Sequence, residues 1–210
     1  MQEEMSGSDL KERFALIEGM IAEGRRSTES WGWVFVLWGV AYLVAIVWAS
    51  WGAGQPGGSV LAGTHSDVAW PVTMFSAAAL TLAIGLRRGP RKMGTLLGRS
   101  VISVWAGIGI SMLVVFPALG FSGRLSAQIF VALVAAMLGA ANGASGLILR
   151  WKMQTACAVV WWVACAVACF GTEAQTSAVF LAAVFVCQIV FGVYVMVRES
   201  QRERGGLAHA

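Results

Sequence analysis

Long apolar segments alternate with short polar ones along most of the chain. After about thirty polar residues, six segments carry almost only apolar side chains: 31–51, 69–86, 100–120, 127–149, 153–171 and 177–197. A helix of about 18 to 23 residues, at about 1.5 Å per residue, crosses a hydrocarbon layer about 30 Å thick. The interiors of these segments hold no Asp, Glu, Lys, Arg or His. The pattern predicts an all-α polytopic membrane protein with six transmembrane helices over residues 31–197.

The composition supports this class over a soluble helical bundle. Of the 210 residues, 58% are apolar and 12% are charged, whereas soluble domains are about half apolar and a quarter charged. Too little polar sequence remains to cover six buried core helices with a soluble surface. A Trp in each odd-numbered segment (Trp38, Trp105, Trp162) would suit three helical hairpins in series.

The positive charges predict the orientation of these helices. Fourteen of the fifteen Lys and Arg residues lie before the first segment, between the second and third, between the fourth and fifth, or after the sixth; Arg124 is the exception. The positive-inside rule places that side in the cytoplasm, with both termini there and residues 198–210 as a tail. We expect a bacterial inner membrane, with Arg87 to Lys92 meeting anionic lipids. The net charge of +4 reflects this topology and not a nucleic-acid site.

The polar segment at residues 1–30 holds a predicted amphipathic helix over about residues 8–24. Its apolar residues Leu10, Phe14, Ile17 and Ile21 follow steps of four, three and four, which line one side of a helix. Three roles compete: a helix lying on the inner membrane surface, a helix packed on the cytoplasmic ends of the spans, or a short coiled-coil contact with a partner.

Reactive groups are scarce in the spans. Cys157, Cys165 and Cys169 lie within one arc of the fifth span, with Cys187 in the sixth, and thiolates so placed suit a soft metal such as copper(I). Buried Cys is otherwise a small apolar residue, and we expect core packing here. A serine nucleophile needs a base within hydrogen-bond reach, which the spans do not supply. The sequence therefore predicts no catalytic residue, cofactor or metal site.

The tryptophans divide into two groups. Six lie near span ends, where indole rings suit the lipid interface: Trp31, Trp33, Trp48, Trp51, Trp70 and Trp151. Four lie deeper: Trp38, Trp105, Trp161 and Trp162. Each deep indole N–H needs a hydrogen-bond partner. These four side chains either pack between the helices or line an aromatic cavity.

The main polar residues at depth are Tyr42, Asn142 and Gln188. Uncharged polar groups in lipid usually bond to another helix, each contributing about 1 kcal/mol or less. We expect these three to hold helices together. A pocket for a neutral ligand is the alternative.

The fourth span carries small residues along one face: Ala132, Ala136, Gly139, Gly143 and Gly146. Such a face lets a second helix backbone approach closely. The third span offers a matching series in Ser100, Ser103, Gly107 and Ser111. We expect these two faces to pack together, with Asn142 bonding across the contact.

The order of these elements resembles a group of uncharacterised bacterial six-span membrane proteins. The resemblance rests on the polar N-terminal helix, "FVLWG" in the first span and "NGASGLILRWK" at the end of the fourth. It implies the six-span topology and no site residues.

Together these features predict a non-enzymatic membrane protein. We expect a scaffold or regulatory subunit that acts through helix contacts, as a homo-oligomer or within a membrane complex. The alternative is a carrier or channel for a small neutral or weakly polar solute, using Tyr42, Asn142 and Gln188.

Overall fold

The computed structural model describes residues 7–29, 31–51, 66–87 and 96–207, and over these ranges the chain forms seven helices and no strand. Apart from α1 (Gly7–Glu29), they are α2 (Gly32–Ser50), α3 (Ser66–Arg87), α4 (Leu96–Phe121), α5 (Ala127–Ile148), α6 (Lys152–Phe170) and a last helix made of α7 (Glu173–Val184), η1 (Phe185–Val190) and α8 (Phe191–Leu207). All six helices after α1 are long and apolar enough to cross a membrane. The predicted number and order of apolar helices are confirmed.

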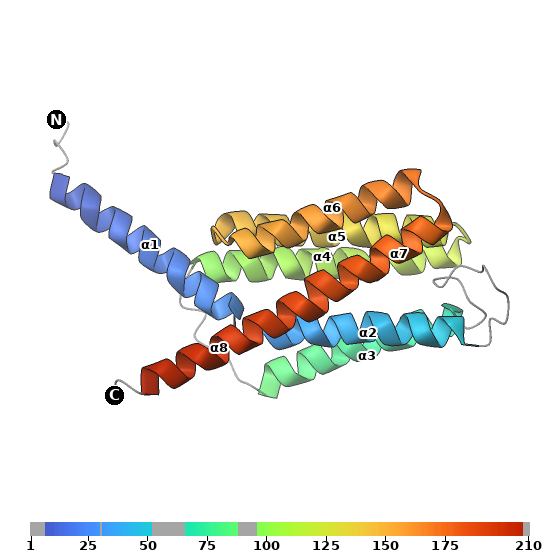
Figure 1. The fold of residues 1–210 in the computed structure, drawn as a ribbon, viewed down its shortest axis with the longest axis horizontal. Helices are drawn as coiled ribbons and strands as arrows, with labels where there is room; N and C mark the ends of the chain where they lie inside the picture. The colour runs from blue at the N-terminus through green and yellow to red at the C-terminus, as the bar shows by residue number, and fades with distance from the viewer. Residues whose placement is uncertain (1–6, 30, 52–65, 88–95, 208–210) are drawn as a thin grey trace.

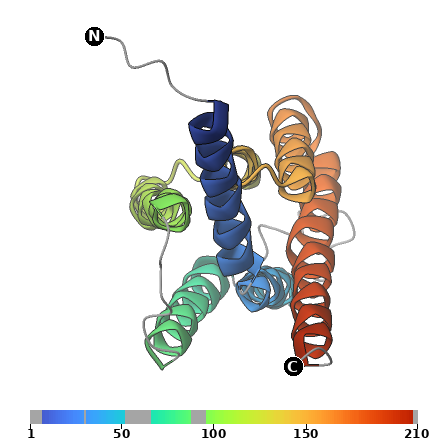
Figure 2. The same cartoon turned by 90° about the vertical axis from the view of Figure 1, so that its left-hand side faces the viewer.

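The six apolar helices run side by side along the long axis of the molecule (Figure 1). Viewed from one end, α2 and α3 lie together on one side, α4 lies apart from α3, and α5 lies behind α1 (Figure 2). Helix α3 packs on α2, α4 packs on α5, and the last helix packs on α2 and α6. The most buried helix is α5, with 56% of its apolar window inside the structure, against 6% for α4. The core is therefore built around α5.

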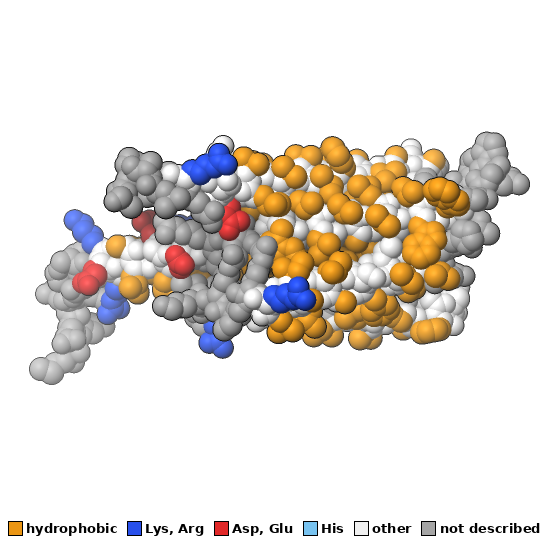
Figure 3. All heavy atoms as spheres, turned by 90° about the horizontal axis from the view of Figure 1, so that it is seen from below, with side chains coloured by type: hydrophobic (Ala, Val, Ile, Leu, Met, Phe, Trp, Pro, Cys, Tyr) orange, Lys and Arg blue, Asp and Glu red, His pale blue; other side chains and the backbone are white. Residues whose placement is uncertain are grey.

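Most of the described charged side chains gather at one end of the molecule, and Arg124 and Glu173 lie at the other. In Figure 3 the visible Lys, Arg, Asp and Glu side chains lie toward the end that carries α1, and apolar side chains form a broad belt over the rest of the visible face. The end of α8 lies at the same end as α1 (Figure 1). This separation of charge from apolar surface is compatible with a multi-pass membrane protein.

Local capping explains where two of the helices begin. The Ser126 hydroxyl accepts a hydrogen bond from the Ile129 N–H at 3.2 Å, at the start of α5. At the start of α7, Thr172 and Gln175 form a reciprocal capping box, which satisfies two backbone N–H groups that the helix leaves free. Gly123, between α4 and α5, has φ +67°, a conformation that glycine adopts without steric cost.

The π-helical segment η1 keeps one face of the last helix directed inward. Phe180, Cys187 and Val195 are all buried along it. In a regular α-helix the direction of a side chain drifts by about 60° over the fifteen residues from Phe180 to Val195, at about 100° per residue. The wider turn of a π-helix offsets such a drift. Residues on both sides of η1 therefore share one buried face.

Candidate functional site

The small face of α5 packs against α6. A Cβ built on Gly139 would lie 2.5 Å from Cδ1 and Nε1 of Trp162, and one on Gly143 would lie 3.0 Å from the far edge of the same indole. At Gly146 the added atom would lie 2.5 Å from Thr155 Oγ1. These three glycines are buried, whereas Ala132 and Ala136 are half-buried. The glycines let α6 approach closely, and Trp162 fills the space that their missing side chains leave.

The expected pairing of the third and fourth spans through small residues is wrong. Ser100, Ser103, Gly107 and Ser111 are exposed on α4. In the described part of the chain, no atom outside the helix backbone lies within 4 Å of a Cβ built on Gly107. The contact between α4 and α5 instead includes a hydrogen bond from Trp105 Nε1 to Ser145 Oγ at 3.0 Å. A large side chain reaches across this contact, so the two backbones do not need small residues to meet.

The structure places Tyr42, Asn142 and Gln188 inside the bundle, each on a different helix. Asn142 is 1% exposed, and its Nδ2 donates to the Leu138 carbonyl of its own helix at 2.8 Å. Among the described residues its Oδ1 has no hydrogen-bond partner. The expectation that Asn142 bonds across a helix contact is therefore wrong. Gln188 lies in η1, where its Cβ faces Gly39 of α2.

One aromatic side chain from each of the six apolar helices joins a continuous aromatic cluster. Its members, in the order α2 to α7, are Tyr42, Trp70, Phe116, Phe130, Trp161 and Phe180. Neighbouring ring centroids are 4.6 to 6.3 Å apart, the range in which ring pairs attract each other. Phe180 is at its centre, because it contacts Tyr42, Phe130 and Trp161. The cluster therefore links all six apolar helices through ring contacts.

Of the tryptophans assigned to the lipid interface, Trp151 lies inside instead and Trp70 is half-buried. Trp151 is buried and packs on Phe191 of α8, with ring centroids 5.4 Å apart. Trp70 belongs to the aromatic cluster. A position near the end of a span does not decide whether an indole faces lipid or the neighbouring helices, and here both indoles contact rings on other helices.

The four cysteines do not form one group. Cys157 is buried, Cys165 is half-buried and Cys169 is exposed. Cys157 instead lies beside Cys187, whose thiol donates to the Cys157 carbonyl at 3.7 Å. Within the described ranges, no cluster of three or more metal-ligating residues occurs.

Sequence reasoning missed several buried groups. Gln154, near the start of α6, is fully buried, and among the described residues neither of its amide atoms has a hydrogen-bond partner. A second glycine contact joins α2 to the last helix through Gly32, Gly39 and Gly192. The seven-residue spacing of Gly32 and Gly39 puts both on one face of a helix, and this spacing was the available signal. Nothing in the sequence marks Gln154 as buried.

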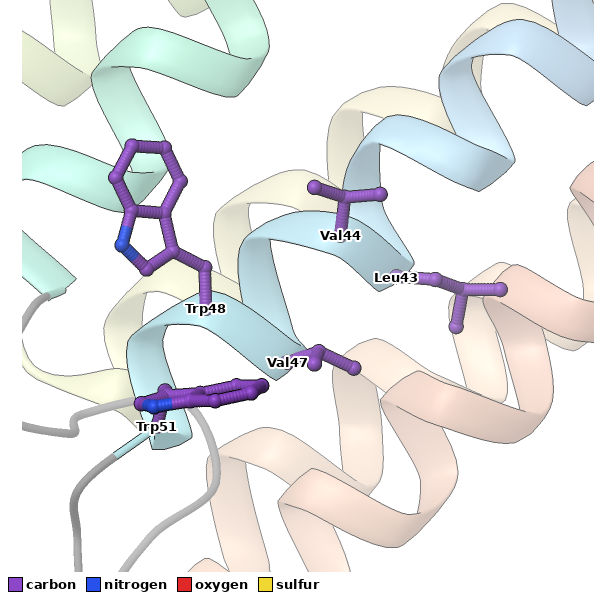
Figure 4. A pocket seen from close by; sticks show the side chains of 5 residues that line it. All are labelled: Leu43, Val44, Val47, Trp48 and Trp51. Atoms are coloured by element: carbon purple, nitrogen blue, oxygen red, sulfur yellow. The ribbon is translucent and has the colours of Figure 1, made fainter.

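A shallow apolar groove of about 380 Å³ lies on the surface at the end of α2. Its lining side chains come from that helix and from the residue that follows it (Figure 4): Leu43, Val44, Val47, Trp48 and Trp51. None of them is charged. The groove presents an apolar surface of the kind that meets lipid, and it offers little to bind a polar solute.

Helix α1 is held at one end and exposed along most of its length. A Cβ on Gly24 would lie 3.1 Å from Leu149 and 3.5 Å from Leu97, so this end of α1 packs tightly against α4 and the end of α5. The rest of α1 extends obliquely away from the bundle (Figure 1). Phe14 is 61% exposed and Ile17 is 50% exposed. Phe14 and Ile17 are thus presented outward and do not cover the ends of the apolar helices, whereas Ile21, nearer to Gly24, is half-buried.

Compared with known protein families, curated proteins and solved structures, the chain matches none. The six-span topology therefore rests on the six apolar helices themselves.

Proposed function

We propose that this chain is a non-enzymatic integral membrane protein of a bacterial inner membrane, and that it serves as a scaffold or regulatory subunit. Its six apolar helices anchor the protein with both termini in the cytoplasm, and α1 is the element that binds a protein partner. The observation that carries this proposal is the position of α1, which is fixed by Gly24 at one end while Phe14 and Ile17 are exposed.

The charge of α1 favours a protein partner over the lipid surface. Over residues 7–29 the chain has five acidic residues (Asp9, Glu12, Glu18, Glu23, Glu29) and four basic ones (Lys11, Arg13, Arg25, Arg26). Helices that lie on anionic membranes are rich in Lys and Arg on their polar face, and each such residue contributes about 1 kcal/mol near the surface. A helix with slightly more acidic than basic residues gains little there. Its exposed apolar residues are better covered by another protein.

Removing α1 tests this proposal. The full chain and a variant lacking residues 1–26 are purified in native lipid nanodiscs, and the mass and composition of the particles are compared. We expect the variant to lose its bound partner chains while the six-helix domain stays folded. Removal of residues 208–210 is the truncation control and leaves the particles unchanged. Identical particles with and without residues 1–26 would refute the docking role.

A carrier for a small neutral solute is the second candidate. The buried Asn142 Oδ1, which has no hydrogen-bond partner in the described part of the chain, favours it, as does the π-helical segment at Gln188, since such segments are frequent at functional sites. The aromatic cluster weighs against it, because its rings occupy part of the interior that a solute path would need. Binding of a neutral solute that Asn142→Leu abolishes, with the fold intact, would favour the carrier.

A further inference from the structure

Three apolar residues of α1, of which Phe14 and Ile17 are exposed and Ile21 is half-buried, follow the spacing of a two-stranded coiled coil. Phe14, Ile17 and Ile21, named here the α1 stripe, are separated by three and four residues, as are alternating a and d positions of a heptad. Phe14 and Ile21 then occupy a positions and Ile17 a d position. The next d position is Gly24, which packs against the bundle. The stripe therefore begins where the contact between Gly24 and the bundle ends, and it is free to bind another helix.

Charged residues beside the α1 stripe indicate which helix fits it. In this register Arg13 is a g position and Glu18 is the e position of the following heptad, and both are exposed. In a parallel two-stranded coiled coil, g of one helix lies next to e of the following heptad on the other. Two copies of α1 in parallel would place Arg13 of each beside Glu18 of the other. The helix is complementary to itself in this arrangement.

The membrane supplies the orientation that this pairing needs. Copies inserted with the same topology present α1 on the same side of the bilayer, so a two-fold axis along the membrane normal brings two α1 helices together in parallel. The stripe is short, since residues 14–21 span little more than one heptad, but two helices held in one plane meet at high effective concentration. In addition, α1 packs against α4, the least buried apolar helix. A second copy beside α4 would cover both the α1 stripe and the exposed side of α4.

We propose that the α1 stripe binds α1 of a second copy of this chain, as a parallel coiled coil with Arg13 and Glu18 paired between copies. This inference rests on the proposed docking role of α1 and names its partner.

Charge reversal tests the pairing. Donor- and acceptor-labelled copies are reconstituted in liposomes at a fixed protein-to-lipid ratio, and energy transfer reports the dimer population. Arg13→Glu or Glu18→Arg alone makes both symmetric pairs repulsive and should lower dimerisation on the order of tenfold. The double variant R13E/E18R should restore it, because the pairs are again opposite in charge. Single variants that dimerise normally, or a double variant no better than the singles, would overturn the proposal.

A cysteine cross-link tests the geometry in the same liposomes. Ile17→Cys should give a disulfide-linked dimer, while Glu12→Cys, exposed at an f position on the other side of α1, should not; the unaltered chain sets the baseline. Equal cross-linking of the two variants, or none at Ile17→Cys, would contradict the pairing. If removal of residues 1–26 changes the assembly while these tests fail, α1 docks on a different protein. If that removal changes nothing, the docking role itself is wrong.

Discussion

Gly32 of α2 and Gly192 of α8 face each other where the two helices cross. A Cβ on Gly32 would lie 3.0 Å from the Gly192 carbonyl oxygen, and a Cβ on Gly192 would lie 2.9 Å from the Gly32 carbonyl oxygen. Because the blocking atoms belong to the backbone, no side-chain rotation relieves the clash. We expect Gly192→Ala to force the helices apart and to lower the free energy of unfolding by about 1–3 kcal/mol.

Gly109→Ala is the matched control for that substitution. Within the described ranges, no atom outside the helix backbone lies within 4 Å of a Cβ at Gly109 of α4. The change should be neutral or slightly stabilising, since Ala favours helix over Gly. Reversible unfolding in detergent measures both variants. Equal effects at Gly192 and Gly109 would show that the crossing of α2 and α8 is not tight.

Phe180 should contribute far more to stability than Phe185 on the same helix. Phe180 is fully buried at the centre of the aromatic cluster, whereas Phe185 is 54% exposed. We expect Phe180→Ala to cost about 3–5 kcal/mol through the cavity and the lost ring contacts, and Phe185→Ala less than about 1 kcal/mol. The unfolding midpoints of the two variants measure this difference in stability. A small effect at Phe180 would mean that the cluster does not hold the six helices together.

Asn142→Leu should not weaken the bundle. The side chain makes its hydrogen bond within α5, and Oδ1 is buried with no partner among the described residues. Replacing it with an apolar side chain of similar size removes a desolvated carbonyl, which should stabilise the fold by about 1 kcal/mol. The same unfolding measurement tests this. A clear loss of stability would show that Asn142 has a polar partner in the working protein.

These contacts show which features of the fold the sequence predicts and which it does not. Apolar run length alone predicts the six long helices, and the Gly139, Gly143 and Gly146 spacing predicts a face suited to close packing. The helix predicted to pack on that face was the wrong one, because spacing within one helix does not indicate which helix lies opposite. The helix that packs there is α6, because the indole of its Trp162 fills the space over the glycines.

Buried polar groups were harder still to predict. No pattern in the sequence marks the π-helical segment around Gln188. Gln154 lies just inside a predicted span, where polar residues are ordinary, and only the arrangement of the other helices buries it.

Thiol labelling tests the proposed orientation. Cysteines are introduced singly at Ile17 in α1 and at Ser122 in the turn between α4 and α5, both exposed. In intact cells whose outer membrane has been made permeable, an impermeant maleimide should label position 122 at once and position 17 only after the inner membrane is lysed. The reverse order would place α1 outside the cytoplasm and remove it from the partners proposed here.

The role of α1 as the docking element is tested most directly by two neighbouring substitutions. Leu16 and Ile17 are both exposed and apolar, but only Ile17 lies on the α1 stripe. The measurement is the particle mass of Ile17→Asp and Leu16→Asp in native lipid nanodiscs, compared with the unaltered chain. We expect Ile17→Asp to reduce the mass to that of a single chain and Leu16→Asp to leave the assembly intact. Equal masses for the two variants would contradict the account.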